Sequence, residues 1–170
     1  RSLTEISAFL SPSVNPSVDG LSDVFESATS LISEHVNRQI MVIGDYDVDG
    51  IVSTSLFMRA LHVWGARARY HIPDRFTEGY GLSDPIVTRI LASKIDLIIT
   101  LDCGIGHVKQ VQRLRDHGVD VLILDHHRCG DTVPDANVII NPCFLPDAHF
   151  LRYLCAAGTA YQFLSYVQDT

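Results

Sequence analysis

The stretch IMVIGDYDVDG, residues 40–50, decides the fold, because a short apolar run passes directly into three alternating aspartates. Residues 40–43 are continuously hydrophobic, which predicts a strand buried on both faces. Residues 51–64 carry apolar side chains at helical spacing, and Gly65 follows as a stop signal. The stretch therefore predicts a strand and a helix joined by an acidic loop.

The rest of the chain repeats this alternation of short strands and helices. Further strands are expected at residues 66–72, 95–101, 119–124 and 137–140, and further helices at residues 21–36, 83–91, 107–117 and 156–167. Apolar strands that alternate with helices in this way are typical of parallel sheets covered by helices. We therefore expect an α/β fold with a mostly parallel sheet of about five strands and helices on both faces.

The composition predicts a short lead-in segment followed by one domain. Residues 11–20, SPSVNPSVDG, are rich in residues that interrupt regular structure, so residues 1–20 are expected to form the lead-in. The chain has 170 residues, of which 46% are hydrophobic and 19% charged, enough for one domain with a buried core. We expect this domain at residues 21–170.

Charge and cysteine content narrow the function classes. The formal net charge of −7 does not by itself indicate a nucleic-acid partner, although carboxylates that bind a cation would account for part of it. No CxxC pair is present, which argues against a zinc ribbon or a disulfide framework. No apolar stretch reaches the roughly 18 residues of a membrane span. A reduced, cytoplasmic protein without membrane contact is therefore expected. The four cysteines are Cys103, Cys129, Cys143 and Cys155.

Three of the predicted strands end in acidic or imidazole side chains. In chain order these are Asp45 with Asp47, then Asp102, then Asp125 with His126 and His127. Ligands of parallel sheets bind beyond the carboxyl ends of the strands, so the three groups are expected to meet. Mixed carboxylate and imidazole ligands suit manganese, iron or zinc, and the excess of oxygen favours manganese or magnesium. The sequence therefore predicts a metal site.

Simpler interpretations exist for these residues. Asp45 and Asp47 could cap the following helix in a solvated loop, and Asp49 could be a turn residue before Gly50. His126 and His127 could be ordinary loop residues. The thiols beside the predicted ligands, Cys103 and Cys129, could bind a softer metal, but neither has thiol-ligand spacing. The remaining histidines are expected on solvated helix faces or loops: His35, His62, His107, His117 and His149.

Five ordered segments resemble the DHH phosphoesterase superfamily and, within it, the RecJ-type single-strand-specific exonucleases. They are DYDVDG, PDRFTEGYGLSDP, LDCG, DHH and NVIINP, and the likeness extends from FLSPSVNP to LCAAGTAYQFL. The resemblance implies a phosphodiesterase with two metal ions, Mn²⁺ or Mg²⁺.

By the same resemblance, the metal ligands are Asp45, Asp47, Asp102 and His126. Asp125 is a further candidate, either as a ligand or as a partner that orients one. His127 either orients a neighbour or contacts the phosphate. Asp45, Asp47, Asp102, His126 and His127 together form the expected catalytic set.

Other residues are candidates for binding the substrate. Arg75 is expected to clamp a phosphate through its forked guanidinium, with Glu78 as its partner, unless it is a surface arginine in a flexible loop. Gly79 and Gly81 would permit close approach of the backbone to the substrate. Arg128 could also meet a phosphate, and a solvated turn is the alternative.

The resemblance implies a 5′-to-3′ exonuclease that acts on single-stranded DNA, releases 5′-mononucleotides and serves DNA repair or recombination. Two alternatives stay open: a phosphodiesterase for short oligoribonucleotides or cyclic dinucleotides, and a non-catalytic replication scaffold. The segment PDRFTEGYGLS favours the exonuclease over the small-substrate branch, and the intact acidic residues argue against the scaffold. Expected partners are single-stranded nucleic acid and repair or replication proteins.

The chain also departs from the family pattern. A later aspartate motif and a second domain that grips nucleic acid are expected beyond Thr170, so the domain is expected to be incomplete at its C-terminus and the segment alone need not be active. Ile43 stands where some relatives carry histidine, and Cys103 where asparagine is common.

Overall fold

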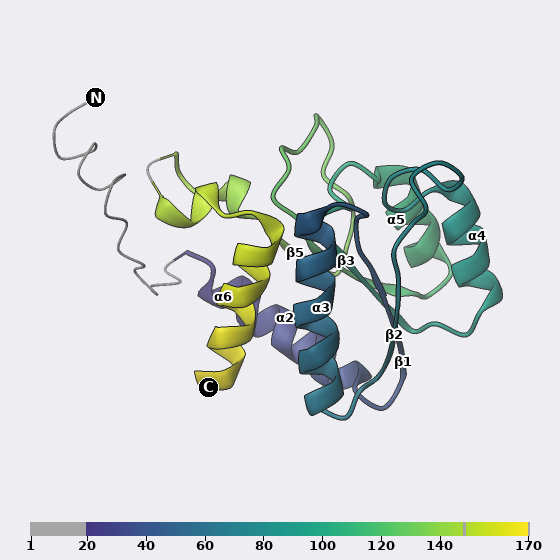
Figure 1. The fold of residues 1–170 in the computed structure, drawn as a ribbon, viewed down its shortest axis with the longest axis horizontal. Coiled ribbons are helices and arrows are strands. Elements are labelled where there is room, and N and C mark those ends of the chain that lie inside the picture. The colour runs from purple at the N-terminus through teal and green to yellow at the C-terminus, as the bar shows by residue number, and fades with distance from the viewer. Residues whose placement is uncertain (1–19, 148, 170) are drawn as a thin grey trace, which may run out of the picture.

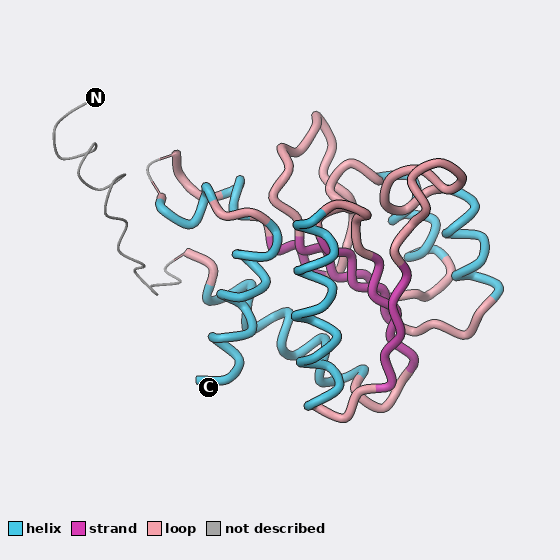
Figure 2. Tube along the Cα trace, in the orientation of Figure 1, coloured by secondary structure: helices cyan, strands magenta, loops and turns pink. Residues whose placement is uncertain are grey.

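A computed structural model describes residues 20–147 and 149–169, so the predicted lead-in segment, apart from Gly20, lies outside the described residues. Five strands form one sheet in the order β2-β1-β3-β4-β5, and every neighbouring pair is parallel (Figures 1 and 2). The strands are β1 Gln39–Ile43, β2 Arg67–His71, β3 Leu97–Leu101, β4 Asp120–Leu124 and β5 Val138–Ile140. The predicted α/β fold is confirmed.

Helices cover both faces of this sheet, because the strand side chains alternate between two buried clusters. Helices α2, α3 and α6 pack on one face, and α4 and α5 on the other (Figure 1). The helices are α2 Ser22–His35, α3 Val48–Val63, α4 Asp84–Ala92, α5 Val108–Asp116 and α6 Ala156–Asp169, with short 3-10 turns η1 Pro142–Phe144 and η2 Phe150–Tyr153.

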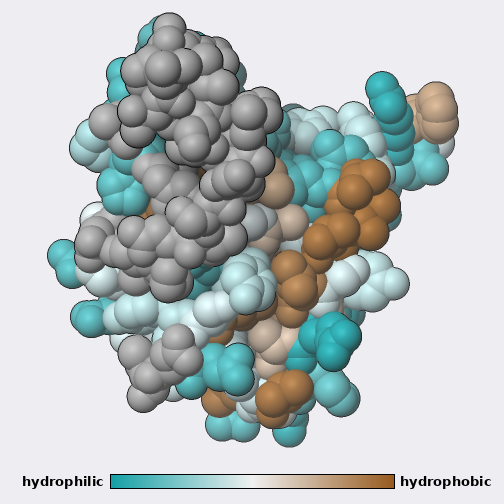
Figure 3. Space-filling view, turned by 60° about the vertical axis from the view of Figure 1, so that its left-hand side comes forward, coloured by the Kyte–Doolittle hydropathy of each residue, from teal (hydrophilic) through white to brown (hydrophobic). Residues whose placement is uncertain are grey.

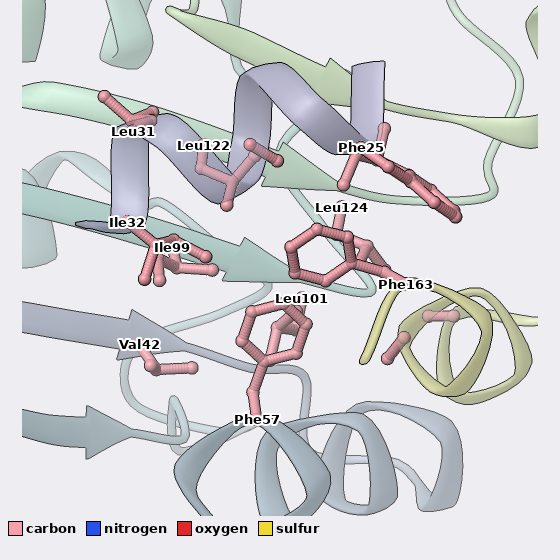
Figure 4. Close-up of a cluster of buried hydrophobic side chains, with 14 of the residues drawn as sticks. Phe25, Leu31, Ile32, Val42, Phe57, Ile99, Leu101, Leu122, Leu124 and Phe163 are labelled. Atoms are coloured by element: carbon pink, nitrogen blue, oxygen red, sulfur yellow. The ribbon is translucent and has the colours of Figure 1, made fainter. Parts of the chain in front are cut away.

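Three phenylalanines join α2, α3 and α6 into one layer (Figure 4). The ring of Phe163 packs edge-on against Phe25, with 5.4 Å between centroids, and stacks on Phe57 at 5.7 Å. All three side chains are fully buried. Burying a large apolar side chain contributes about 1.5–3 kcal/mol relative to leaving it exposed. The three aromatic rings therefore hold α6 against both α2 and α3.

The strand order places a topological switch point between β1 and β3. From β1 the chain crosses to β2 on one side, and from β2 it crosses back over to β3 on the other side. Loops that leave two neighbouring strands in opposite directions open a crevice at their carboxyl ends, where ligands of such folds bind. The aspartates after β1 and β3 lie at this crevice.

The acidic segment after β1 is not wholly a loop. Helix α3 begins at Val48, three residues before its predicted start, and Asp47 is its N-cap, with Oδ1 accepting a 3.0 Å hydrogen bond from the amide of Gly50. A side chain on Gly50 would come within 2.5 Å of the Asp45 backbone. Only glycine therefore lets the helix start this close to the strand end.

Two of the histidines expected on solvated surfaces are packed instead. His35 is 2% exposed, its Nδ1 lies 2.8 Å from the carbonyl of Leu31, and its Nε2 lies 3.2 Å from Asp120 Oδ2. His107 is half-buried, and Gly81 packs against its ring. Both predictions were wrong. His35 lies on a face of α2 that turns toward β4, and His107, the N-cap residue of α5, packs on the loop after β2. His62 and His117 are exposed, as predicted.

On the face drawn in Figure 3, hydrophobic side chains form a narrow band among hydrophilic ones. Within the described part of the chain, no helix combines the length and hydrophobicity needed to cross a membrane. All four cysteines are free thiols.

Candidate metal centre

The three predicted strand ends meet in the structure. Asp45, Asp47 and Asp102 form one group of candidate ligands, and Asp102, His126 and His127 form a second. Within each group the potential ligand atoms all lie within 4.8 Å of one another. Because Asp102 belongs to both groups, its carboxylate is placed to bridge two neighbouring cations.

The buried carboxylates of the first group have few partners for their charge. Asp45 is 5% exposed and Asp102 is 2% exposed. Asp45 Oδ1 has no hydrogen-bond partner among the described residues. Burial raises the pKa of both carboxyl groups, and the charge of Asp47 raises each further. A cation would supply the missing positive charge, so these residues fit a metal ion.

The backbone of Asp102 adopts the left-handed conformation, with φ of 62°, which is uncommon for a residue other than glycine. Its amide donates to the carbonyl of Leu124 at 3.0 Å, and its carbonyl accepts a 2.7 Å hydrogen bond from the hydroxyl of Tyr80. These two hydrogen bonds hold the turn after β3 in a conformation that points the shared carboxylate into the centre. Tyr80 was not among the predicted site residues.

Asp125 organises the loop after β4. Its Oδ2 accepts from the amide of Ile105 at 3.0 Å, and its Oδ1 accepts from the amides of His126 at 2.8 Å and His127 at 3.1 Å. The same Oδ1 lies 2.7 Å from His127 Nδ1. Since both oxygens already have partners, the arrangement favours the orienting role over the ligand role. With Nδ1 donating to Asp125, His127 Nε2 is its free ligand atom.

His126 faces two carboxylates. Its Nε2 lies 3.2 Å from Asp102 Oδ1 and 3.6 Å from Asp49 Oδ2. The Asp102 carboxylate, as an acceptor for the imidazole, and the charges of both carboxylates raise the pKa of His126 against the opposing effect of burial. Imidazole and carboxylate thus converge on one point, as expected for a ligand pair.

Asp49 is not a turn residue, so its simpler interpretation was wrong. It lies in the first turn of α3, beside His126, and accepts hydrogen bonds from the amides of Ala156 and Ala157 at 2.8 Å each. Its role was missed because its partners lie 107 and 108 residues away, and no local spacing signals such a contact.

Arg75 lies beside the first ligand group. Its guanidinium stands over the ring of Tyr46, 5.3 Å from the centroid, and its charge acts to lower the pKa of Asp45. The loop around it is ordered by Asp74, whose Oδ1 accepts from the amides of Phe76 and Thr77 at 2.9 Å. Arg75 itself is exposed, so its role as a phosphate clamp stays a prediction beside the alternative of a surface arginine.

The predicted pair of Arg75 with Glu78 is wrong. Glu78 instead forms an ion pair with Arg89 through Oε1. Its Oε2 lies 2.9 Å from His71 Nε2 and accepts a 2.9 Å hydrogen bond from the amide of Asp74. The physical reason is that β2 and α4 bring His71 and Arg89 to Glu78 together.

The remaining substrate candidates differ in their surroundings. Gly81, with φ of 62°, packs so closely on His107 that a side chain there would come within 2.7 Å of the ring. In the structure, Gly81 therefore permits a close approach of the backbone to His107. Gly79 has a φ of 80° and open space around it, and Arg128 is exposed. Substrate contacts of these three residues stay predictions.

Comparison with known families matches residues 39–170 to the DHH family, N-terminal domain. The single-stranded-DNA-specific exonuclease RecJ of Bacillus subtilis is 35% identical over 139 residues, which cover 81% of this chain and 18% of that protein. RecJ of Escherichia coli is 41% identical over 125 residues, covering 72% and 22%. The chain thus spans about a fifth of the length of these curated relatives.

Solved structures agree with this likeness. A crystal structure of exonuclease RecJ bound to manganese superposes with a TM-score of 0.80 at 32% identity, covering 92% of this chain and 40% of that one.

Proposed function

The chain belongs to the DHH family, and from this premise we propose that it forms the metal-binding part of a 5′-to-3′ exonuclease that acts on single-stranded DNA and releases 5′-mononucleotides. The observation that carries the proposal is the pair of ligand groups that share Asp102. Two-ion phosphodiester hydrolysis uses two neighbouring cations, and a carboxylate shared by two ligand groups could hold them side by side.

Asp45, Asp47 and Asp102 would hold one Mn²⁺ or Mg²⁺, and Asp102 with His126 and the free nitrogen of His127 would hold the other. Bound ions of this kind activate a water and neutralise charge that develops on the scissile phosphate. The oxygen-rich first group suits either metal, and the imidazoles of the second group favour manganese. Asp125 would keep both histidines in register through the hydrogen bonds to their amides.

Arg75 supports the proposal for a phosphate substrate. It is a cation at the edge of an acidic centre, held over Tyr46 at 5.3 Å rather than paired with Glu78. Its guanidinium is therefore available for a bidentate contact with a phosphate group. Gly79, Gly81 and Arg128 are the further candidates for contact with the nucleic acid.

Two observations count against the alternative functions, a phosphodiesterase for small substrates and a non-catalytic scaffold. The loop that carries Arg75 and Tyr80 reaches the centre through the hydrogen bond to Asp102, and this segment is the one that favours RecJ-type chains over enzymes for oligoribonucleotides or cyclic dinucleotides. A non-catalytic scaffold would not need buried carboxylates such as Asp45 and Asp102 in one cluster. The proposal extends to a cytoplasmic role in DNA repair or recombination, alongside repair or replication proteins.

The test is digestion of end-labelled single-stranded DNA, duplex DNA and short RNA by the purified full-length protein, with Mn²⁺, Mg²⁺ or a chelator. We expect metal-dependent release of mononucleotides from the 5′ end of single-stranded DNA, and loss of activity in Asp102→Ala. A preference for short RNA would favour the second function. Undiminished activity in chelator or in Asp102→Ala would overturn the proposal.

A further inference from the structure

The carboxylate of Asp49 connects two distant parts of the chain. It belongs to the first turn of α3, and it accepts hydrogen bonds from the amides of the first two residues of α6, Ala156 to Oδ2 and Ala157 to Oδ1, at 2.8 Å each. The first amides of a helix have no partner within the helix, and a negative charge beside them is stabilising. Asp49 therefore caps α6 from another element.

The same carboxylate faces the candidate metal centre. Its Oδ2, which accepts from Ala156, lies 3.6 Å from His126 Nε2. Its charge raises the pKa of both Asp102 and His126. The Asp49 side chain is only 19% exposed, so water screens these interactions weakly. The Asp49 carboxylate thus binds the first amides of α6 and at the same time lies beside His126 of the metal centre.

Without a cation, Asp49 and Asp102 repel each other. This repulsion opposes the position in which Asp49 caps α6. A cation between Asp102 and His126 would remove that repulsion, and an ionised carboxylate has enough acceptor positions to keep both amides while it faces an ion. Cation binding and the capped position of α6 are therefore expected to favour each other.

Helix α6 is also fixed at its middle, since Phe163 stacks on Phe57 of α3 (Figure 4). Phe57 lies about two helical turns after Asp49, and Phe163 lies more than one turn after Ala157. The aromatic contact therefore holds α6 on α3 independently of the metal. A change at Asp49 should accordingly loosen the first turn of α6 without releasing the helix.

We propose that Asp49 is a positioning residue that couples the first turn of α6 to the His126 side of the metal centre. This inference rests on the proposed function, because it assumes that a cation binds at the metal centre. It adds that the bound cation orders the first turn of α6. By reciprocity, interactions that order the start of α6 must strengthen cation binding by the same factor.

The first experiment follows hydrogen exchange of the α6 amides with and without Mn²⁺, in the wild type, in Asp49→Asn and in the control Asp84→Asn. Asp84 also lies in a first helical turn, but of α4, and its Oδ1 accepts from Gln110. We expect Mn²⁺ to slow exchange in the first turn of α6 by about fivefold or more in the wild type and in Asp84→Asn. No slowing is expected in Asp49→Asn.

A second variant tests the coupling by a change in α6 and leaves the Asp49 carboxylate intact. Ala157→Pro removes one of the two donors to Asp49, at a first-turn position where proline is tolerated. We expect its Mn²⁺ affinity, measured by calorimetry, to fall by about fivefold or more. The matched control is the conservative Ala157→Ser, which keeps the amide and should keep the affinity.

The outcomes separate the two proposals. If the wild type binds no Mn²⁺, the metal centre itself is wrong. If Mn²⁺ binds but exchange in α6 does not change, or if Asp49→Asn still shows the slowing, the coupling is overturned while the metal centre stands. Unchanged affinity in a folded Ala157→Pro would overturn the coupling as well.

Discussion

The hydroxyl group of Tyr80 donates a 2.7 Å hydrogen bond to the backbone carbonyl of Asp102. The same hydroxyl lies 3.5 Å from His127 Nδ1. Burial, followed by the neighbouring Cys103 and acidic groups, raises the pKa of Tyr80, so its proton stays in place as a donor. One tyrosine from the loop after β2 therefore joins the strand ends of β3 and β4.

Tyr80→Phe removes this donor and leaves the carbonyl of Asp102 without it. We expect the free energy of unfolding to fall by about 1–3 kcal/mol, the usual result of leaving a buried polar group unpaired. Mn²⁺ affinity should fall too, because the left-handed turn that aims the shared carboxylate loosens. Denaturant unfolding and calorimetry measure the two effects. Tyr161→Phe, on an exposed ring, is the control, and equal values for the two variants would contradict the role of Tyr80.

Asp102→Asn removes the charge shared by the two ligand groups. Asparagine accepts the left-handed conformation, so the turn should survive. In the absence of metal the melting temperature should rise, because one of several crowded carboxylate charges is gone. The increase in melting temperature that Mn²⁺ causes in the wild type should disappear. Asp131→Asn, in an exposed loop, serves as control, and a retained Mn²⁺ effect in Asp102→Asn would contradict the bridging assignment.

The pKa values of Asp45 and Asp102 predict the pH dependence of stability. Both are raised in the folded protein above the ordinary value of about 3.9, first of all by burial. A raised folded pKa contributes stability that is fully present below the unfolded pKa and is lost as pH rises through the folded pKa. The metal-free contribution of these two groups should therefore decrease from about pH 4 upward.

Metal binding should reverse this trend, since the ionised carboxylates are what the cation binds. The gain in melting temperature on adding Mn²⁺ should be larger at pH 8 than at pH 5. Thermal unfolding at both pH values, with Mn²⁺ and with chelator, measures the difference. A gain that was larger at the lower pH would contradict the assignment of these carboxylates as ligands.

Arg75→Ala should weaken binding of single-stranded DNA more than binding of Mn²⁺. The guanidinium lies over Tyr46 at the edge of the ligand group and is not itself a ligand. Arg75→Lys keeps the charge but loses the planar fork, so it should recover only part of the affinity. Anisotropy of a labelled oligonucleotide and calorimetry with Mn²⁺ measure the two affinities. A fall in Mn²⁺ affinity alone would refute the phosphate clamp.

Much of the candidate centre follows from the sequence. Parallel strands end at the same edge of a sheet, so Asp45, Asp102 and His126, each placed just after an apolar run, were expected together and are found together. The strand alternation was also sufficient for the α/β fold, because buried parallel strands need continuous apolar runs. These features depend on short-range spacing, which the sequence records directly.

The tertiary structure alone decided the contacts between distant elements. Three contacts illustrate this: Asp49 caps α6, His35 is buried against Asp120, and Glu78 pairs with Arg89 instead of Arg75. In each case the packing of two elements decides which side chains meet. The order β2-β1-β3-β4-β5, which puts β1 beside β3, likewise depends on how helices pack on the sheet. Local spacing determines which groups end each strand, whereas packing determines which of those groups touch.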